Sequence, residues 1–129
     1  MQYLFLMYCD EAHHMTEEEA QHARATHWAV HEEASAKGAF RAASPLYPTS
    51  TAISVRPKNG SVAITDGPFA ETKEALGGFY LLECRDVEEA KYWAGRLAQT
   101  GCATTVEIRQ VAGMPASATE EAVAEAIHV

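Results

Sequence analysis

The chain has 129 residues, of which 47% are hydrophobic and 22% are charged, so we expect one globular domain with a sizeable core. Its formal net charge is −8 at pH 7, and lysine and arginine nowhere form a run. This charge balance argues against nucleic acid and anionic membranes as partners. The three cysteines are an odd number without CxxC spacing, which favours free thiols in a reducing compartment, the cytoplasm.

Residues 3–9 predict a β-strand whose two faces are both apolar. The N-terminal stretch has neither a basic lead nor a small-residue cleavage site, and it is too short to span a bilayer, so no secretion signal is expected. Helices can cover one face of such a strand. A second copy of the chain is the simplest cover for the other face.

A first helix is predicted from Thr16 to about Lys37, and it stops at Gly38. Thr16 and Glu19 form a capping-box pattern at its start. The apolar residues at helical spacing are expected to face the sheet: Ala25, Trp28, Ala29 and Ala36.

The remaining strands are predicted over residues 39–46, 52–56, 61–65, 78–84 and 104–111. The Asn59-Gly60 pair predicts a hairpin between the second and third of these strands. Asp86 caps a second helix, predicted over residues 87–99. Its buried stripe is expected to consist of Ala90, Trp93, Ala94 and Leu97.

The order of elements is β-α-β, a hairpin, then β-α-β. With right-handed crossovers this order predicts an α+β fold, a ferredoxin-like antiparallel sheet with two helices on one face. Two such sheets that meet at their open faces make a dimeric α/β barrel. We expect the domain to cover residues 1–113, and residues 114–129 to form an alanine- and glutamate-rich extension that is helical from Thr119.

Residues 65–78 concentrate charges, glycines and a proline between two strands. Pro68 fixes its own backbone and restricts Gly67, so the loop should hold one shape and can aim a carboxylate. Asp66 is therefore a candidate proton carrier at the mouth of a half-apolar pocket. The alternative is an Asx-type turn, in which the Asp66 carboxylate accepts backbone N–H bonds and fixes the loop.

The loop carries the motif Asp66-Gly67-Pro68-Phe69, and Gly77-Gly78-Phe79-Tyr80 opens the strand behind it. Together with residues 3–8 and 106–109, these stretches resemble the DGPF branch of the YCII-related proteins over roughly residues 1–112. The resemblance implies a homodimeric α/β barrel. It also implies membership of a wider superfamily that includes muconolactone isomerases and cofactor-free monooxygenases. Some relatives in the DGPF branch are associated with sigma factors.

The resemblance further implies a catalytic His-Asp pair. The Arg24-x-x-His27 pattern matches the family's histidine, and Asp66 would supply the acid, because residues 99–101 lack the Asp-Pro that many relatives carry. An imidazole has an unperturbed pKa of about 6.5, which suits acid–base work near neutral pH. His27 and His31 are also spaced to share a metal, but the sequence supplies no further ligand motif, so we expect no metal and no cofactor.

Three more residues are candidates for substrate binding. Lys73 and Arg109 could each hold an anionic group, and Glu71 lies beside Lys73 in the same loop. The alternatives are a solvated turn for Glu71 and Lys73, and an ion pair with Glu107 for Arg109.

Two functional hypotheses follow. The first is a cofactor-free acid–base enzyme, isomerase- or lyase-like, that moves a proton in a small organic acid or lactone. His27 and Asp66 would act as acid and base. The second is a non-catalytic module that binds a small ligand or a regulatory protein linked to transcription. In that case the extension after residue 113 would be the docking element.

Overall fold

The structure is a computed structural model that describes residues 1–113, 121, 124–125 and 127, and it confirms the predicted order of elements. The strands are β1 (Gln2–Cys9), β2 (Phe40–Pro45), β3 (Ile53–Lys58), β4 (Ser61–Asp66), β5 (Ala75–Glu83) and β6 (Thr105–Gln110). The helices are α1 (Glu17–Ala36) and α2 (Val87–Ala98), with a short 3-10 turn, η1 (Thr49–Thr51). The expected extension over 114–129 lies mostly outside the described residues.

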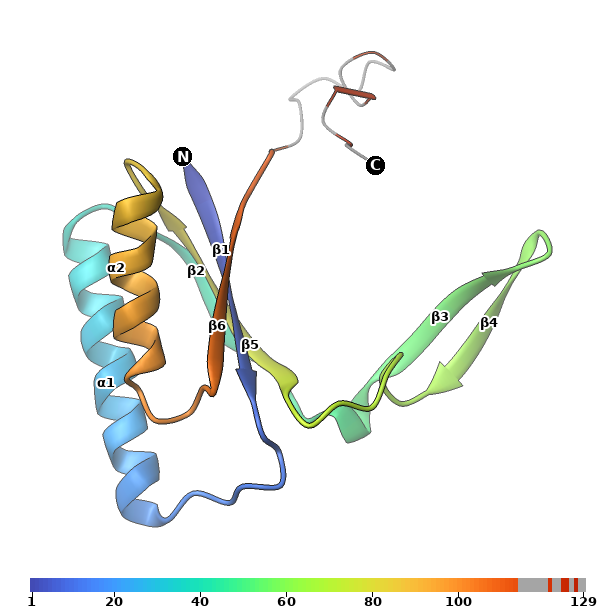
Figure 1. The fold of residues 1–129 in the computed structure, drawn as a ribbon, viewed down its shortest axis with the longest axis horizontal. Helices are drawn as coiled ribbons and strands as arrows, with labels where there is room; N and C mark the ends of the chain where they lie inside the picture. The colour runs from blue at the N-terminus through green and yellow to red at the C-terminus, as the bar shows by residue number, and fades with distance from the viewer. Residues whose placement is uncertain (114–120, 122–123, 126, 128–129) are drawn as a thin grey trace.

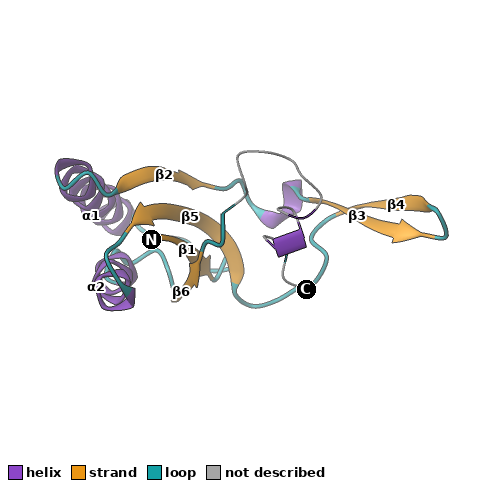
Figure 2. Ribbon diagram, turned by 90° about the horizontal axis from the view of Figure 1, so that it is seen from above, coloured by secondary structure: helices purple, strands orange, loops and turns teal. Residues whose placement is uncertain are grey.

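Four strands form one antiparallel sheet in the order β2-β5-β1-β6, and both helices lie on the same face of it (Figure 1). This is the expected α+β, ferredoxin-like arrangement. Strands β3 and β4 form a separate two-stranded ribbon, which we call the arm (residues 53–66). The arm is inserted between the two halves of the fold and projects away from the sheet, on the side opposite the helices (Figures 1 and 2).

Strand boundaries differ from the sequence prediction around the arm. The turn between β3 and β4 contains only Asn59 and Gly60, which both have positive φ (45° and 79°), as a tight two-residue hairpin requires. Asp66 is the last residue of β4 and not part of the loop that follows. Strand β5 begins at Ala75, because Ala75 pairs with Cys9, so the two glycines at 77–78 lie inside the strand.

The core lies between the helices and one face of the sheet. Tyr3, Phe5 and Met7 alternate along β1 and are buried on this face. The predicted stripe of α2 is also confirmed, and its residues are all buried: Ala90, Trp93, Ala94 and Leu97. The opposite face carries apolar side chains that are only half-buried, since both helices lie on the other side: Leu4, Leu6, Phe79 and Leu81.

The predicted stripe of α1 is wrong. Ala25, Ala29 and Ala36 are exposed, and Trp28 is 62% exposed. The buried residues are Ala23, Val30 and Ala34. Val30 is the one aliphatic side chain of this helix larger than alanine, so its burial gains the most among them, and it sets which alanines turn inwards at three- and four-residue spacing.

Glu33 of α1 ties the two helices together. Its carboxylate accepts hydrogen bonds from the Arg96 guanidinium, from the Tyr92 hydroxyl at 2.9 Å and from Lys37 Nζ at 3.2 Å. These hydrogen bonds, that of Arg96 first, lower the pKa of Glu33 to about 2. The carboxylate is therefore charged in the folded chain well below its ordinary range.

Glu33→Gln should lower the free energy of unfolding by about 1 kcal/mol at neutral pH, because the ion pair with Arg96 is partly solvated. The folded-state pKa of Glu33 is depressed, so the wild-type advantage is full above the ordinary value of 4.5 and disappears as pH falls towards 2. Chemical denaturation at neutral pH and at about pH 3 checks this. Glu32→Gln, at an exposed neighbouring position, is the control, and a difference that does not shrink in acid would contradict the assignment.

Gly77 is needed for packing against β1, since a Cβ there would lie 2.6 Å from Cys9 Sγ. Gly77→Ala should destabilise the chain by about 1–3 kcal/mol through overpacking. Cys9→Ala removes the sulfur and should recover most of that loss in the double variant, because the next contact, Met7 O, lies at 3.7 Å. Thermal and chemical denaturation of the four chains measure the coupling, and purely additive effects would rule out this contact as the cause.

Candidate functional site

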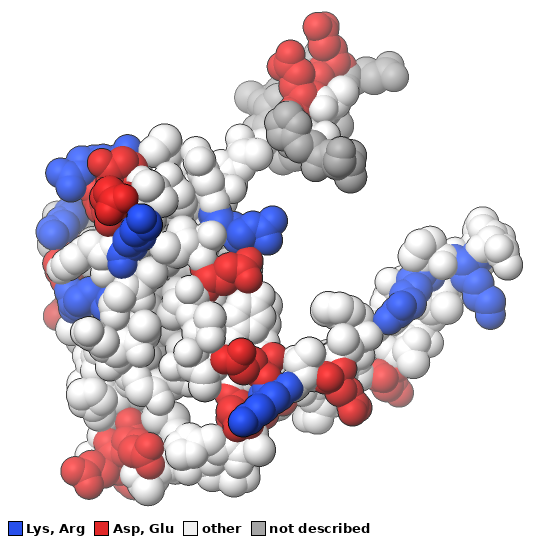
Figure 3. All heavy atoms as spheres, in the orientation of Figure 1, with Lys and Arg blue, Asp and Glu red and all other residues white. Residues whose placement is uncertain are grey.

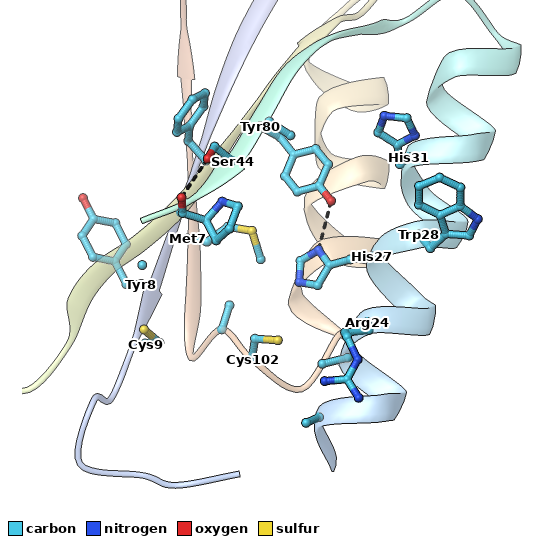
Figure 4. A pocket seen from close by; sticks show the side chains of 18 of the residues that line it. Met7, Tyr8, Cys9, Arg24, His27, Trp28, His31, Ser44, Tyr80 and Cys102 are labelled. Carbon is cyan, nitrogen blue, oxygen red and sulfur yellow. Dashed lines mark hydrogen bonds between the residues drawn. The ribbon is translucent and has the colours of Figure 1, made fainter. Parts of the chain in front are cut away.

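A cavity of about 650 Å³ lies between α1 and the ends of β1, β2 and β5. Its lining is mainly apolar and aromatic. Side chains drawn in Figure 4 include Met7, His27, Trp28, His31, Tyr80 and Cys102. The cavity thus opens on the helix-covered side of the sheet, at the end where β1 and β2 stop.

His27 and Tyr80 form the polar centre of this cavity. His27 Nδ1 lies 3.0 Å from Tyr80 Oη, and the two ring planes differ by only 11°. Burial lowers the pKa of His27 below its ordinary value of 6.5 and raises the pKa of Tyr80 above 10. Both groups are therefore neutral near pH 7. In Figure 4 the imidazole reaches from α1 towards the tyrosine hydroxyl on β5.

Local sequence explains why these two side chains meet. His27 precedes Val30 by three residues and so lies on the buried side of α1. Tyr80 pairs with Phe5 in β1. It lies two residues before Leu82, so both side chains are on the helix-facing side of β5. Gly78 lies on the same side of β5, and a Cβ there would lie 3.0 Å from Ser44 O, so the glycine allows β2 to lie close to β5 at the cavity wall.

The other walls are aromatic or contain sulfur. Trp28 and His31 stack with ring centroids 5.4 Å apart, and His31 also lies 4.3 Å from the Phe40 ring. Cys9 and Cys102 are half-buried free thiols on the wall, and burial raises the pKa of the Cys9 thiol. The lining residues of the cavity include no Asp or Glu.

Arg24 lies at the edge of the cavity, one helical turn before His27. Its side chain is 65% exposed, and Nη2 lies 3.3 Å from a carboxylate oxygen of Glu17 on the same helix. Arg24 is therefore a solvated rim residue that already has an acidic neighbour.

Of the five residues proposed for catalysis or substrate binding, only His27 lines this cavity. Asp66 is exposed at the end of β4, and a single chain does not bring it to His27. Arg109 is exposed on β6, where Nη1 lies 3.3 Å from Glu107, the ion pair given above as its alternative. Glu71 is also exposed in the loop before β5.

Lys73 lines a second, more polar hollow of about 680 Å³. Glu74 in the same hollow accepts hydrogen bonds from the hydroxyls of Thr104 and Thr105, which fasten the loop after the arm to the start of β6. These hydrogen bonds lower the pKa of Glu74, with that of Thr104 as the main cause. The loop is thus attached to the sheet near the end of β1.

Tyr80 was not predicted as a site residue, although the sequence contains a signal for it. A tyrosine at a buried strand position needs a hydrogen-bond partner for its hydroxyl. In the structure His27, on the buried side of α1, is that partner, and the misplaced stripe of this helix concealed the pairing.

Neither a metal site nor a membrane helix is found in the part of the chain that the structure describes. No group of three or more His, Cys, Asp or Glu side chains there is arranged to hold a metal ion. In the same residues, no helix combines the length and the apolar character needed to cross a membrane.

Comparison with solved structures finds 5-chloro-2-hydroxyhydroquinone dehydrochlorinase (TftG) from Burkholderia phenoliruptrix AC1100, in complex with 2,5-dihydroxybenzoquinone. It is 13% identical in sequence, with a TM-score of 0.46, and the match covers 85% of this chain and 92% of that one. So distant a likeness carries no inference about activity.

Among curated proteins, uncharacterized protein R00369 from Rhizobium meliloti (strain 1021) is 43% identical over 68 residues, which are 52% of this chain and 55% of that relative. This chain therefore spans about half the length of the curated relative that it matches. The closer assignment to the DGPF branch stays a prediction. The model of the YCII-related domain matches residues 1–114, and the chain therefore belongs to the YCII-related family.

Proposed function

We propose that the cavity binds a small organic molecule and that His27 and Tyr80 move a proton between two of its carbon atoms, an isomerase- or lyase-like reaction. The observation that carries this proposal is the 3.0 Å contact between His27 Nδ1 and Tyr80 Oη inside a largely apolar cavity. Such a pair combines a base with a hydrogen-bond donor where water competes little. Tyr80 takes the place that sequence reasoning gave to Asp66.

The roles of the two groups follow from one tautomer of His27. With its proton on Nδ1, the imidazole donates to Tyr80 Oη and leaves Nε2 free to accept a proton. Tyr80 Oη then donates its own hydrogen to a carbonyl oxygen of the substrate. His27 Nε2 takes a proton from the carbon next to that carbonyl, and the C–H electrons form an enolate. The protonated His27 returns the proton at the far carbon, so no atom is gained or lost.

His27→Ala should lower the rate of proton transfer about 100-fold or more, and Tyr80→Phe about tenfold. Suitable substrates are neutral β,γ-unsaturated lactones and ketones, such as α-angelica lactone. Their conversion to the conjugated isomer is followed by absorbance, and deuterium uptake from D2O is followed by NMR. His22→Ala, an exposed histidine of the same helix, is the control and should keep wild-type rates.

The pH profile tests the same base. Because burial lowers the pKa of His27, kcat/KM should be constant at neutral pH and fall only as pH drops through a pKa below 6.5. A wild-type chain that binds these probes without moving a proton would contradict the catalytic proposal. It would favour the alternative, a non-catalytic ligand-binding module.

We also propose a homodimer in which a second copy covers the open sheet face and the arm. By register, Ile53, Val55, Val62 and Ile64 share one face of the arm, where each is between 57% and 69% exposed. A two-stranded ribbon alone is marginally stable in water. The half-buried leucines of the open sheet face lie on the side to which the arm projects (Figures 1 and 2). A two-fold pairing would cover both surfaces of both copies.

Leu6→Glu on the open face and Ile64→Glu on the arm should each shift the chain from dimer to monomer, because a buried unpaired carboxylate is costly. Sedimentation equilibrium over a dilution series measures this. Ala25→Glu on the exposed side of α1 is the matched control. A wild-type chain that sediments as a monomer, or variants with unchanged assembly, would overturn the proposal.

The state of the cysteines indicates the cellular compartment of the chain. Cys9, Cys84 and Cys102 are all free, which supports a reducing environment. We therefore assign the chain to the cytoplasm as part of this proposal.

A further inference from the structure

We propose that the cavity selects neutral, flat, largely apolar molecules that carry one hydroxyl or carbonyl oxygen, and that it discriminates against carboxylates. This inference rests on the proposed function in taking the His27–Tyr80 cavity as the ligand site. It replaces the sequence-based expectation of an anionic substrate held by Arg109 or Lys73, neither of which lines this cavity.

The charges around the cavity support a neutral ligand. Among the lining residues, which are all described, Arg24 is the one side chain that is always charged near pH 7, and it is largely solvated at the rim beside Glu17. No Asp, Glu or Lys lines the cavity, so a cation lacks a buried counter-ion as well. In Figure 3, Lys and Arg lie mainly over the upper ends of the helices, next to acidic side chains, and on the arm.

Desolvation decides between a hydroxyl and a carboxylate. A carboxylate that enters an apolar cavity without a cationic partner loses hydration that nothing replaces. A hydroxyl or carbonyl loses much less and regains a hydrogen bond from Tyr80 Oη or the His27 ring, which lie 3.0 Å apart. The formal charge of −8 also disfavours the approach of anions.

The walls favour a flat ring. The Trp28 and His31 rings are stacked and nearly parallel, with 7° between their planes, and the His27 and Tyr80 rings form a second nearly parallel pair. Aromatic faces bind other rings well by stacking. A volume of about 650 Å³ lies within the usual range of small-molecule sites and leaves room for substituents on the ring.

The test is a matched pair of ring probes, 4-methylphenol and 4-methylbenzoate, titrated into the full chain at neutral pH. The two differ chiefly in charge. Binding is measured by calorimetry and by tryptophan fluorescence, to which Trp28 in the cavity lining contributes together with Trp93. We expect the phenol to bind at least about tenfold more tightly than the benzoate. Equal affinities, tighter binding of the benzoate, or no binding of either probe would overturn the inference.

Two variants locate the selectivity. Tyr80→Phe should weaken binding of 4-methylphenol about fivefold through the lost hydrogen bond while it leaves 4-methylbenzoate unchanged. Arg24→Gln should leave both affinities unchanged, and a loss of benzoate binding in that variant would assign an anion site to Arg24 and contradict the inference. All these readouts are affinities. Failure of proton transfer with intact selectivity would therefore overturn the proposed function alone.

Discussion

Burial of Val30 against the sheet is the constraint on which the site depends. It is fully buried, and it fixes the rotation of α1 about its own axis. Because His27 lies three residues before Val30, this rotation places the imidazole between the helix and the sheet, within hydrogen-bond distance of Tyr80. The same rotation turns Trp28 outwards to the rim, where it stacks on His31. A different rotation would move the His27 imidazole away from Tyr80. The packing of α1 therefore determines the chemistry of the cavity.

Neutrality is the second property that this arrangement produces. The pKa shifts of His27 and Tyr80 both come from burial and both favour the uncharged form. The hydrogen bond between them then needs no counter-ion, and the chain can keep its carboxylates on the surface. The charged network around Glu33 shows the opposite solution: three donors surround a carboxylate that remains partly in contact with water. The chain thus separates the ion pairs that join its helices from the neutral pair inside its cavity.

Sequence reasoning reached the fold because the information was local. Strand alternation in β1, the capping pattern at Thr16 and the turn at Asn59-Gly60 each depend on neighbouring residues. It failed on the buried stripe of α1. Alanines occupy several faces of that helix, and a single valine, Val30, determines which face is buried. The site required that stripe and a contact between residues 27 and 80, which are 53 positions apart. Asp66 stood out because of its glycine and proline neighbours, yet that local pattern marks the end of an arm strand.

The arm also bears on how the chain avoids wrong association. A two-stranded ribbon has an unpaired edge on each strand, and such edges can template β-aggregation. Pro57 removes one backbone donor from β3, and the cationic side chains of Arg56 and Lys58 flank it on the same strand. Both features discourage another strand from adding there. The apolar face of the arm has no such protection, so under the proposed dimer the risk of aggregation would depend on how soon after synthesis two copies meet.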